Sequence, residues 1–337
     1  MKTFRDIPRS VLDLAPIVAG GTAADAFRNS IALVQRAEAW GYLRYWVAEH
    51  HNLPGVASAA TSVVIGRLAA ETSRIRVGAG GIMLSNHAPL VIAEQFGTLE
   101  SMFPGRIDLG LGRAPGGDQP TARALRREHP RAGEEFPQLL AELRGYFRPP
   151  VPGQVIKAVP GAGLDVPIWL LSSSGFSAEL AGVLGLPFAF AGQFSPQAMV
   201  ASCELYRQAF RPTGVLLEPY AMVGVNVIAA DTDAEARRLA TSHQQAFLNM
   251  VRGKPGALPP PVETMDGRWS PAEEAAVMAN LSASITGGPD AVQRGLADLL
   301  ARTQADEIMI NAMIFDPAAR LRSYEIVAEV WPVRRDA

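Results

Sequence analysis

Cysteine is almost absent from this 337-residue chain, in which Cys203 is the only one. A single thiol cannot form an intramolecular disulfide, and it excludes every metal or redox site that needs two cysteines. The scarcity is compatible with a reducing compartment, so we expect a cytoplasmic protein.

The chain also lacks an excess of either charge and a long apolar run. Its 31 basic and 33 acidic residues give a net charge of -2, which leaves no basic surplus to attract nucleic acid. No stretch of about 18 consecutive apolar residues occurs, so we expect no transmembrane helix. Residues 11–20 are apolar, but Asp13 and Pro16 interrupt them and they lack the cleavage pattern of a secretory signal.

Apolar segments typical of strands alternate with segments of helical periodicity along the whole chain. We expect strands at 11–18, 42–48, 74–84, 106–112, 167–171, 187–191, 220–230 and 306–314. The expected helices are 24–40, 59–70, 89–103, one ending near 147, 177–184, 196–210, 233–250 and 318–330. Eight strands, each followed by a helix, predict a parallel sheet that closes into a (β/α)8 TIM barrel.

Two segments do not fit the strand–helix repeat and are interpreted as insertions. Residues 149–165 are rich in proline and glycine, and residues 252–288 contain a triple proline and a short acidic helix near Glu273. Neither is long enough for a core of its own, so we expect one domain over residues 1–337. Long loops in compact domains are often functional, and the 252–288 insertion is a candidate lid.

Barrel enzymes carry their chemistry at the carboxyl ends of the strands, and polar residues 49–52 follow the second expected strand. Strand alternation puts His50 on one face and Glu49 with His51 on the other. One histidine can thus enter the barrel mouth while the neighbouring carboxylate anchors backbone. Two adjacent histidines cannot easily bind one ion, so we predict no metal site. The alternative is a loop of surface histidines.

Arg113 ends the fourth expected strand, among small neighbours. The glycine spacing around it (Gly110, Gly112, Gly116) is not that of a dinucleotide-binding fingerprint. A guanidinium at a strand end suits a phosphate, because its planar donors match phosphate oxygens. A salt bridge at the barrel rim is the alternative.

Serines surround a glycine after the fifth expected strand and lead into a helix. Hydroxyls and free backbone N–H groups at a helix N-terminus form an anion site, whereas an ordinary capping serine would look similar. The candidate anion-binding residues are Ser173, Ser174, Gly175 and Ser177.

The third expected strand contains the run Gly78-Ala79-Gly80-Gly81. Glycine within a strand often marks the close approach of a ligand, and Ala79, Gly80 and Gly81 are the candidates for that contact. A crowded contact between strand and helix is the alternative. His87, at the start of the next helix, is interpreted as a loop histidine.

Taken together, these motifs resemble the bacterial luciferase-like, flavin-dependent monooxygenase superfamily in residue type, order and spacing. The resemblance covers nearly the whole chain and is closest to single-chain oxidoreductases of unassigned substrate. The matching segments are 46–51, 76–81, 88–89 with 93–94, 104–113 and 319–324.

The resemblance implies specific roles for the candidate residues. His50 is expected near the flavin ring, where it assists proton handling. Arg113 is expected to hold the flavin phosphate, together with the turn of Ser173, Ser174 and Ser177. The bond between Gly80 and Gly81 matches a non-proline cis peptide that lies under the flavin ring in the family.

The activity that the resemblance implies is a monooxygenase that uses reduced FMN and oxygen on a small organic substrate. The reduced flavin would be bound or supplied by a flavin reductase, and a homodimer is expected. Gly112 stands where the light-emitting enzyme has a reactive cysteine, so light emission is not expected. The alternatives are a deazaflavin-dependent oxidoreductase, a non-catalytic flavin-binding protein and a metal-dependent barrel hydrolase.

Overall fold

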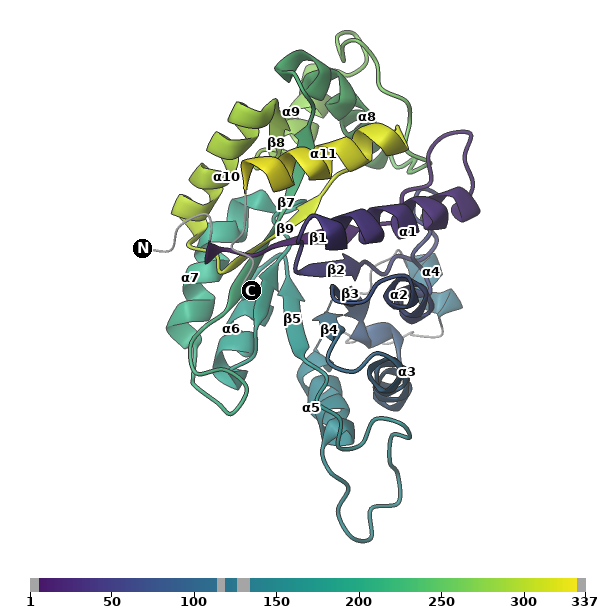
Figure 1. Ribbon diagram of the computed structural model, residues 1–337, viewed down its shortest axis with the longest axis vertical. Helices are drawn as coiled ribbons and strands as arrows, with labels where there is room; N and C mark the ends of the chain where they lie inside the picture. The colour runs from purple at the N-terminus through teal and green to yellow at the C-terminus, as the bar shows by residue number, and fades with distance from the viewer. Residues whose placement is uncertain (1–5, 114–118, 126–133, 332–337) are drawn as a thin grey trace.

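Eight parallel strands close into a barrel in the computed structural model, which describes residues 6–113, 119–125 and 134–331 (Figure 1). Each strand pairs in parallel with its neighbours in the order β1-β2-β3-β4-β5-β6-β7-β9, and β9 closes the ring against β1. This confirms the predicted TIM barrel. The strands are β1 (Arg9–Asp13), β2 (Arg44–Val47), β3 (Arg76–Met83), β4 (Ile107–Gly112), β5 (Ile168–Ser172), β6 (Phe188–Phe190), β7 (Ala221–Ala229) and β9 (Glu307–Asn311).

Helices follow the barrel strands and surround the sheet (Figure 1). No helix of the described residues is long and apolar enough to cross a bilayer. The helices are α1 (Ala23–Ala39), α2 (Thr61–Ala70), α3 (Pro89–Met102), α4 (Gln119–Ala124), α5 (Phe136–Phe147), α6 (Gly175–Leu184), α7 (Met199–Ala209), α8 (Asp233–Val251), α9 (Pro271–Asn280), α10 (Pro289–Thr303) and α11 (Pro317–Val330), with short 3-10 turns η2 (Leu84–Asn86) and η3 (Pro196–Ala198).

The segment between α8 and β9 is more ordered than the sequence predicted. The acidic helix near Glu273 is confirmed as α9, which packs against α8 through Leu248 and Val277. A ninth strand, β8 (Ile285–Gly287), and all of α10 were missed. β8 forms because β7 is long: its last residues extend past the barrel and pair with β8. This segment therefore extends the barrel wall.

The first strand is shorter than predicted, whereas the other insertion is as predicted. The first strand ends at Asp13 instead of continuing to residue 18, because Ala15 has a positive φ of 46° and Pro16 and Val18 make only isolated bridges. Residues 149–165 contain neither helix nor strand, as predicted for an insertion, and project away from the barrel beyond α5 (Figure 1).

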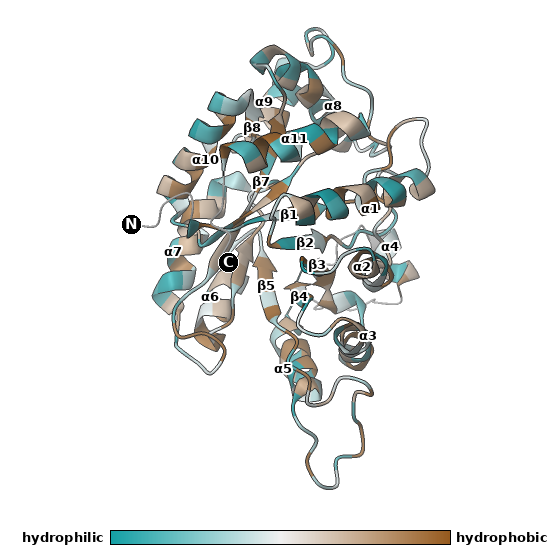
Figure 2. Ribbon diagram, viewed as in Figure 1, coloured by the Kyte–Doolittle hydropathy of each residue, from teal (hydrophilic) through white to brown (hydrophobic). Residues whose placement is uncertain are grey.

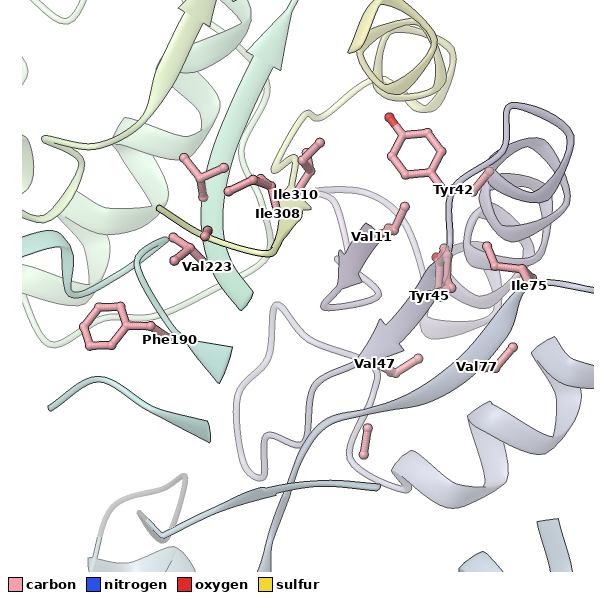
Figure 3. Packing of buried hydrophobic residues seen from close by; sticks show 14 of the residues in the cluster. Val11, Tyr42, Tyr45, Val47, Ile75, Val77, Phe190, Val223, Ile308 and Ile310 are labelled. Atoms are coloured by element: carbon pink, nitrogen blue, oxygen red, sulfur yellow. The ribbon is translucent and has the colours of Figure 1, made fainter. Parts of the chain in front are cut away.

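The larger core lies between the barrel and its helices. Figure 3 shows strand residues such as Val11, Tyr45 and Val77 in this layer, where they are fully buried. The surrounding helices carry both apolar and polar residues, as Figure 2 shows for α7 and α10. Burial of each large apolar side chain stabilises the fold by about 1.5–3 kcal/mol.

The inside of the barrel is filled by a second, smaller cluster built on Trp46 and Trp169, whose rings meet edge to face at 5.2 Å. Leu12, Ala189, Met222 and Met309 complete its buried members. These inward residues alternate with the outward residues of the same strands, as the period of a strand requires. The middle of the barrel is therefore packed with side chains.

A buried ion-pair network lies at the amino end of the barrel. Arg44 Nη1 donates to Asp108 Oδ2 at 2.8 Å, and Arg44 Nε donates to both Glu307 oxygens at 3.1 Å. Arg76 contributes a second guanidinium to Asp108 at 2.7 Å. Removing one partner of such a network leaves an uncompensated buried charge and costs about 3–5 kcal/mol.

The late motif of residues 319–324 fastens α11 to the barrel. Arg320 Nη2 pairs with buried Asp13 at 2.8 Å, and its Nε donates to the carbonyl of Ala312 at 2.9 Å. Ser323 Oγ accepts from the Ala229 amide at 2.9 Å. These contacts give this part of the motif a structural role.

His243 on α8 links stability to pH. Its side chain is buried against Phe247, and burial lowers the pKa of the imidazole from 6.5 to about 4. Between these values the unfolded chain binds a proton that the folded protein does not, so stability falls as pH decreases. We expect the free energy of unfolding of wild type to lose about 3 kcal/mol relative to His243→Leu between about pH 7.5 and pH 4.

Urea unfolding of both proteins over this pH range measures the effect. The difference between the two curves isolates His243, because the carboxylates that titrate in the same range are common to both proteins. Parallel curves would contradict the assignment.

Candidate functional site

A buried carboxylate, Glu49, fastens the end of β2 to the end of β3. Its Oε2 accepts the backbone N–H of Met83 at 3.0 Å, and its Oε1 lies 2.8 Å from His51 Nε2 and 2.9 Å from His87 Nε2. We call Glu49, His51 and His87 the carboxylate clasp. The predicted anchoring of backbone by this carboxylate is confirmed, and the two histidines orient it further.

The sequence interpretation of His87 as a loop histidine was incomplete. η2 and the start of α3 bring it back to Glu49, a contact across 38 positions that local periodicity cannot reveal. The ligand atoms of the clasp lie within 4.8 Å of one another, which is close enough to hold a metal ion. The two short separations between histidine and carboxylate are, however, those of hydrogen bonds.

The clasp keeps Glu49 ionised. Burial raises the pKa of this carboxyl, but hydrogen bonds from His87, His51 and the Met83 amide outweigh burial and hold the pKa below its ordinary value. His50 lies between the two clasp residues of the β2 end and is half-buried. The clasp therefore holds the side chains of both sequence neighbours of His50.

The glycine-rich part of β3 is crowded by the barrel itself. A Cβ at Gly80 would lie 2.9 Å from Leu12 Cδ1, and one at Gly81 would lie 2.8 Å from the Gly110 carbonyl oxygen. The peptide between Gly80 and Gly81 is cis, as the resemblance implied. Neighbouring strands and inward side chains, and not a helix, crowd these two glycines.

Arg113 lies at the N-terminus of α6. Its guanidinium stacks over the ring of Phe176, 4.4 Å from the centroid, and Phe176 is in the first turn of that helix. The Arg113 and serine-turn predictions therefore converge on one place. Phe176 itself was missed by sequence reasoning, because only the fold brings the ends of β4 and β5 together.

The turn of Ser173, Ser174 and Ser177 does not cap the N-terminus of α6 through its N-cap side chain. That residue, Ser174, makes no capping hydrogen bond, whereas its own amide donates to Ser172 Oγ at 3.0 Å. Ser173 accepts from Ser195 Oγ through its carbonyl at 3.2 Å, and Ser177 is buried in the first turn. The N–H groups of that turn thus lack a capping acceptor from Ser174 and favour an anion.

A third polar group, which the sequence did not predict, lies at the carboxyl ends of β7 and β9. Asn226 and Asn311 are register partners, and Asn311 Nδ2 donates to Asn226 Oδ1 at 2.9 Å. Both amides follow apolar inward positions, so a break in the apolar pattern at the strand end is the signal that could have found them.

Loss of the Glu49 charge should destabilise the protein. In Glu49→Gln an NH₂ group replaces one carboxylate oxygen, and an NH₂ group cannot accept a hydrogen bond. The substitution should therefore lower the free energy of unfolding by about 2–4 kcal/mol near neutral pH. Because the folded pKa lies below 4.5, the contribution of the carboxylate is present above that pH and is lost as pH falls through the folded value.

Chemical denaturation of Glu49→Gln measures this loss. Glu179→Gln, at an exposed position of α6, is the matched control and should change stability by less than about 0.5 kcal/mol. Equal effects of the two substitutions would contradict the clasp.

Comparison with known proteins gives a consistent result. The model of the family described as luciferase-like monooxygenase matches residues 9–331. An Escherichia coli protein named luciferase-like monooxygenase is 52% identical over 328 residues, with 97% of this chain and 98% of that protein covered. A Bacillus subtilis N-acetyl-S-alkylcysteine monooxygenase is 36% identical over 253 residues, 73% of this chain and 74% of that protein.

Solved structures agree. The crystal structure of apo-MsnO8 is 36% identical, covers 97% of this chain and 99% of its own, and has a TM-score of 0.88. Two more distant structures share the fold: a diketocamphane monooxygenase constituent with FMN (20% identical, TM-score 0.73) and an F420-dependent alcohol dehydrogenase (13% identical, TM-score 0.71). The chain belongs to the luciferase-like monooxygenase family.

Proposed function

We propose that this protein is a flavin-dependent oxidoreductase, and specifically a monooxygenase that uses reduced FMN and oxygen on a small organic substrate. The observation that carries the proposal is the convergence of Arg113 with the N-terminus of α6. Family membership supports the same activity class.

Arg113 and the first turn of α6 fit the phosphate of FMN. Arginine stays charged at every relevant pH and offers planar donors that match phosphate oxygens. The first turn of α6 adds backbone N–H groups and the positive end of a helix dipole, with no capping hydrogen bond from Ser174 to compete. Arg113, Ser173, Ser174, Gly175 and Ser177 would hold the phosphate.

The flavin ring is proposed to lie at the barrel mouth against Gly80 and Gly81. Ala79, the third residue expected at this contact, is fully buried in the core between the barrel and its helices. Bound reduced FMN supplies the electrons for oxygen chemistry. His50 holds or delivers a proton at its imidazole. Glu49, the residue before His50, is held by the Met83 amide and by His51 and His87.

We also propose a source of the reduced flavin, a second copy of the chain as partner, and a class of substrate. Reduced FMN arrives by diffusion or from a flavin reductase, and two copies of the chain pair in the cytoplasm. The similarity to an N-acetyl-S-alkylcysteine monooxygenase makes thioethers of acylated cysteine the first substrates to test. A deazaflavin is the competing cofactor, and a parallel titration with F420 separates the two.

The proposed phosphate site at Arg113 and the first turn of α6 gives a specific prediction for Arg113→Met. Wild type should bind FMN at least about tenfold more tightly than riboflavin, which lacks the phosphate, and the variant should lose this preference. Fluorescence titration with both flavins measures it.

Arg148→Met, at an exposed residue after α5, is the matched control and should keep the preference for FMN. A wild-type protein that binds the two flavins equally would contradict the phosphate site.

His50→Gln tests the proton role. We expect oxygen-dependent turnover to fall about 10²–10⁴-fold, because the amide has no basic nitrogen to exchange a proton. The dissociation constant of FMN should stay within about threefold. Consumption of N-acetyl-S-methylcysteine with reduced FMN and oxygen, corrected for the reaction without enzyme, gives the rate, and undiminished turnover in the variant would remove His50 from the mechanism.

A further inference from the structure

Three side-chain amides gather at the carboxyl ends of β6, β7 and β9. Asn226 and Asn311 face each other on neighbouring strands and are 2% and 3% exposed. Gln193 follows β6 by three residues, and its backbone carbonyl accepts from Asn226 Nδ2 at 2.6 Å. The three residues belong to one hydrogen-bonded group.

Strand alternation places this group on the inner side of the barrel. Met222 and Met309 belong to the interior cluster, and Asn311 is two residues beyond Met309 on the same face of β9. Gly224 shares the inner face of β7 with Met222, and a Cβ there would collide with Gln193 Oε1. The Gln193 amide therefore lies over the inner face of Gly224.

The hydrogen bonds of the group have a fixed direction. The Gln193 carbonyl can only accept, so Asn226 must present its NH₂ group there and its oxygen to Asn311. Asn311 then donates through Nδ2, which turns its own oxygen away from Asn226. Ser284 Oγ takes the second Asn226 donor at 3.3 Å.

Two buried acceptors are left without a partner in the part of the chain that the structure describes. Asn311 Oδ1 and Gln193 Oε1 are both buried and accept no hydrogen bond from any described residue. Leaving a buried acceptor unsatisfied destabilises the folded state, so each such group in a folded protein needs an explanation.

We propose that Asn311 Oδ1 and Gln193 Oε1 accept hydrogen bonds from a neutral N–H or O–H group of the molecule bound at the barrel mouth. This inference rests on the proposed function, because the bound molecule is either the flavin, through its imide N–H, or the organic substrate, through an amide N–H or hydroxyl. Two uncharged amide oxygens favour a neutral donor over an ammonium group, whose desolvation they cannot offset.

The test compares ligand pairs that differ by one donor. The flavin pair is FMN and N3-methyl-FMN, and the substrate pair is N-acetyl-S-methylcysteine and its N-methyl analogue, which lacks the amide N–H. Affinities are measured by calorimetry for wild type and for Asn311→Leu and Gln193→Met. The second variant leaves the bond between the two asparagines in place. Asn280→Leu on α9 is the control, since its amide bonds to the Ala276 carbonyl of its own helix.

We expect wild type to prefer the donor-bearing member of one pair by about tenfold, and both variants to reduce that preference while Asn280→Leu keeps it. Loss of preference in the flavin pair assigns the acceptors to the cofactor, and loss in the substrate pair assigns them to the substrate. A protein that binds FMN but shows equal preferences in all variants contradicts the inference alone, and water then satisfies the acceptors. A wild type that does not bind FMN contradicts the proposed function as well.

Discussion

A buried charge must be paired with an opposite charge, and this requirement shapes the barrel. Arg44 lies between two carboxylates at the amino end, Asp108 and Glu307, and burial opposes its charge while these neighbours raise its pKa. Above them, Trp46 and Trp169 fill the middle of the barrel. With the base and the middle occupied, the polar groups available for chemistry are those at the carboxyl end.

Three polar groups surround that end, each made by a different pair of neighbouring strands. The carboxylate clasp joins the ends of β2 and β3, Arg113 meets the first turn of α6 after β4 and β5, and the amides lie on β7 and β9 with Gln193 after β6. The strand order spreads these groups around the ring. A molecule with an anionic end, a reactive centre and a neutral donor would meet all three.

Much of this arrangement could be predicted from sequence, because it depends on local signals. Alternation of strands and helices predicts the barrel, and polar residues after apolar strands predict Glu49 and Arg113. His87, Phe176 and Asn311 were missed as members of polar contacts, because each acquires its role from a strand or helix distant in the sequence. The strand β8 was missed for the same reason: three residues become a strand only beside the extended end of β7.

A crystal structure of the protein with FMN tests the central claim most directly. The account predicts the phosphate within hydrogen-bond distance of Arg113 and of backbone N–H groups in the first turn of α6, with the ring at the carboxyl end of the barrel. A phosphate bound elsewhere, with Arg113 still stacked on Phe176 and no flavin contact to α6, would contradict it.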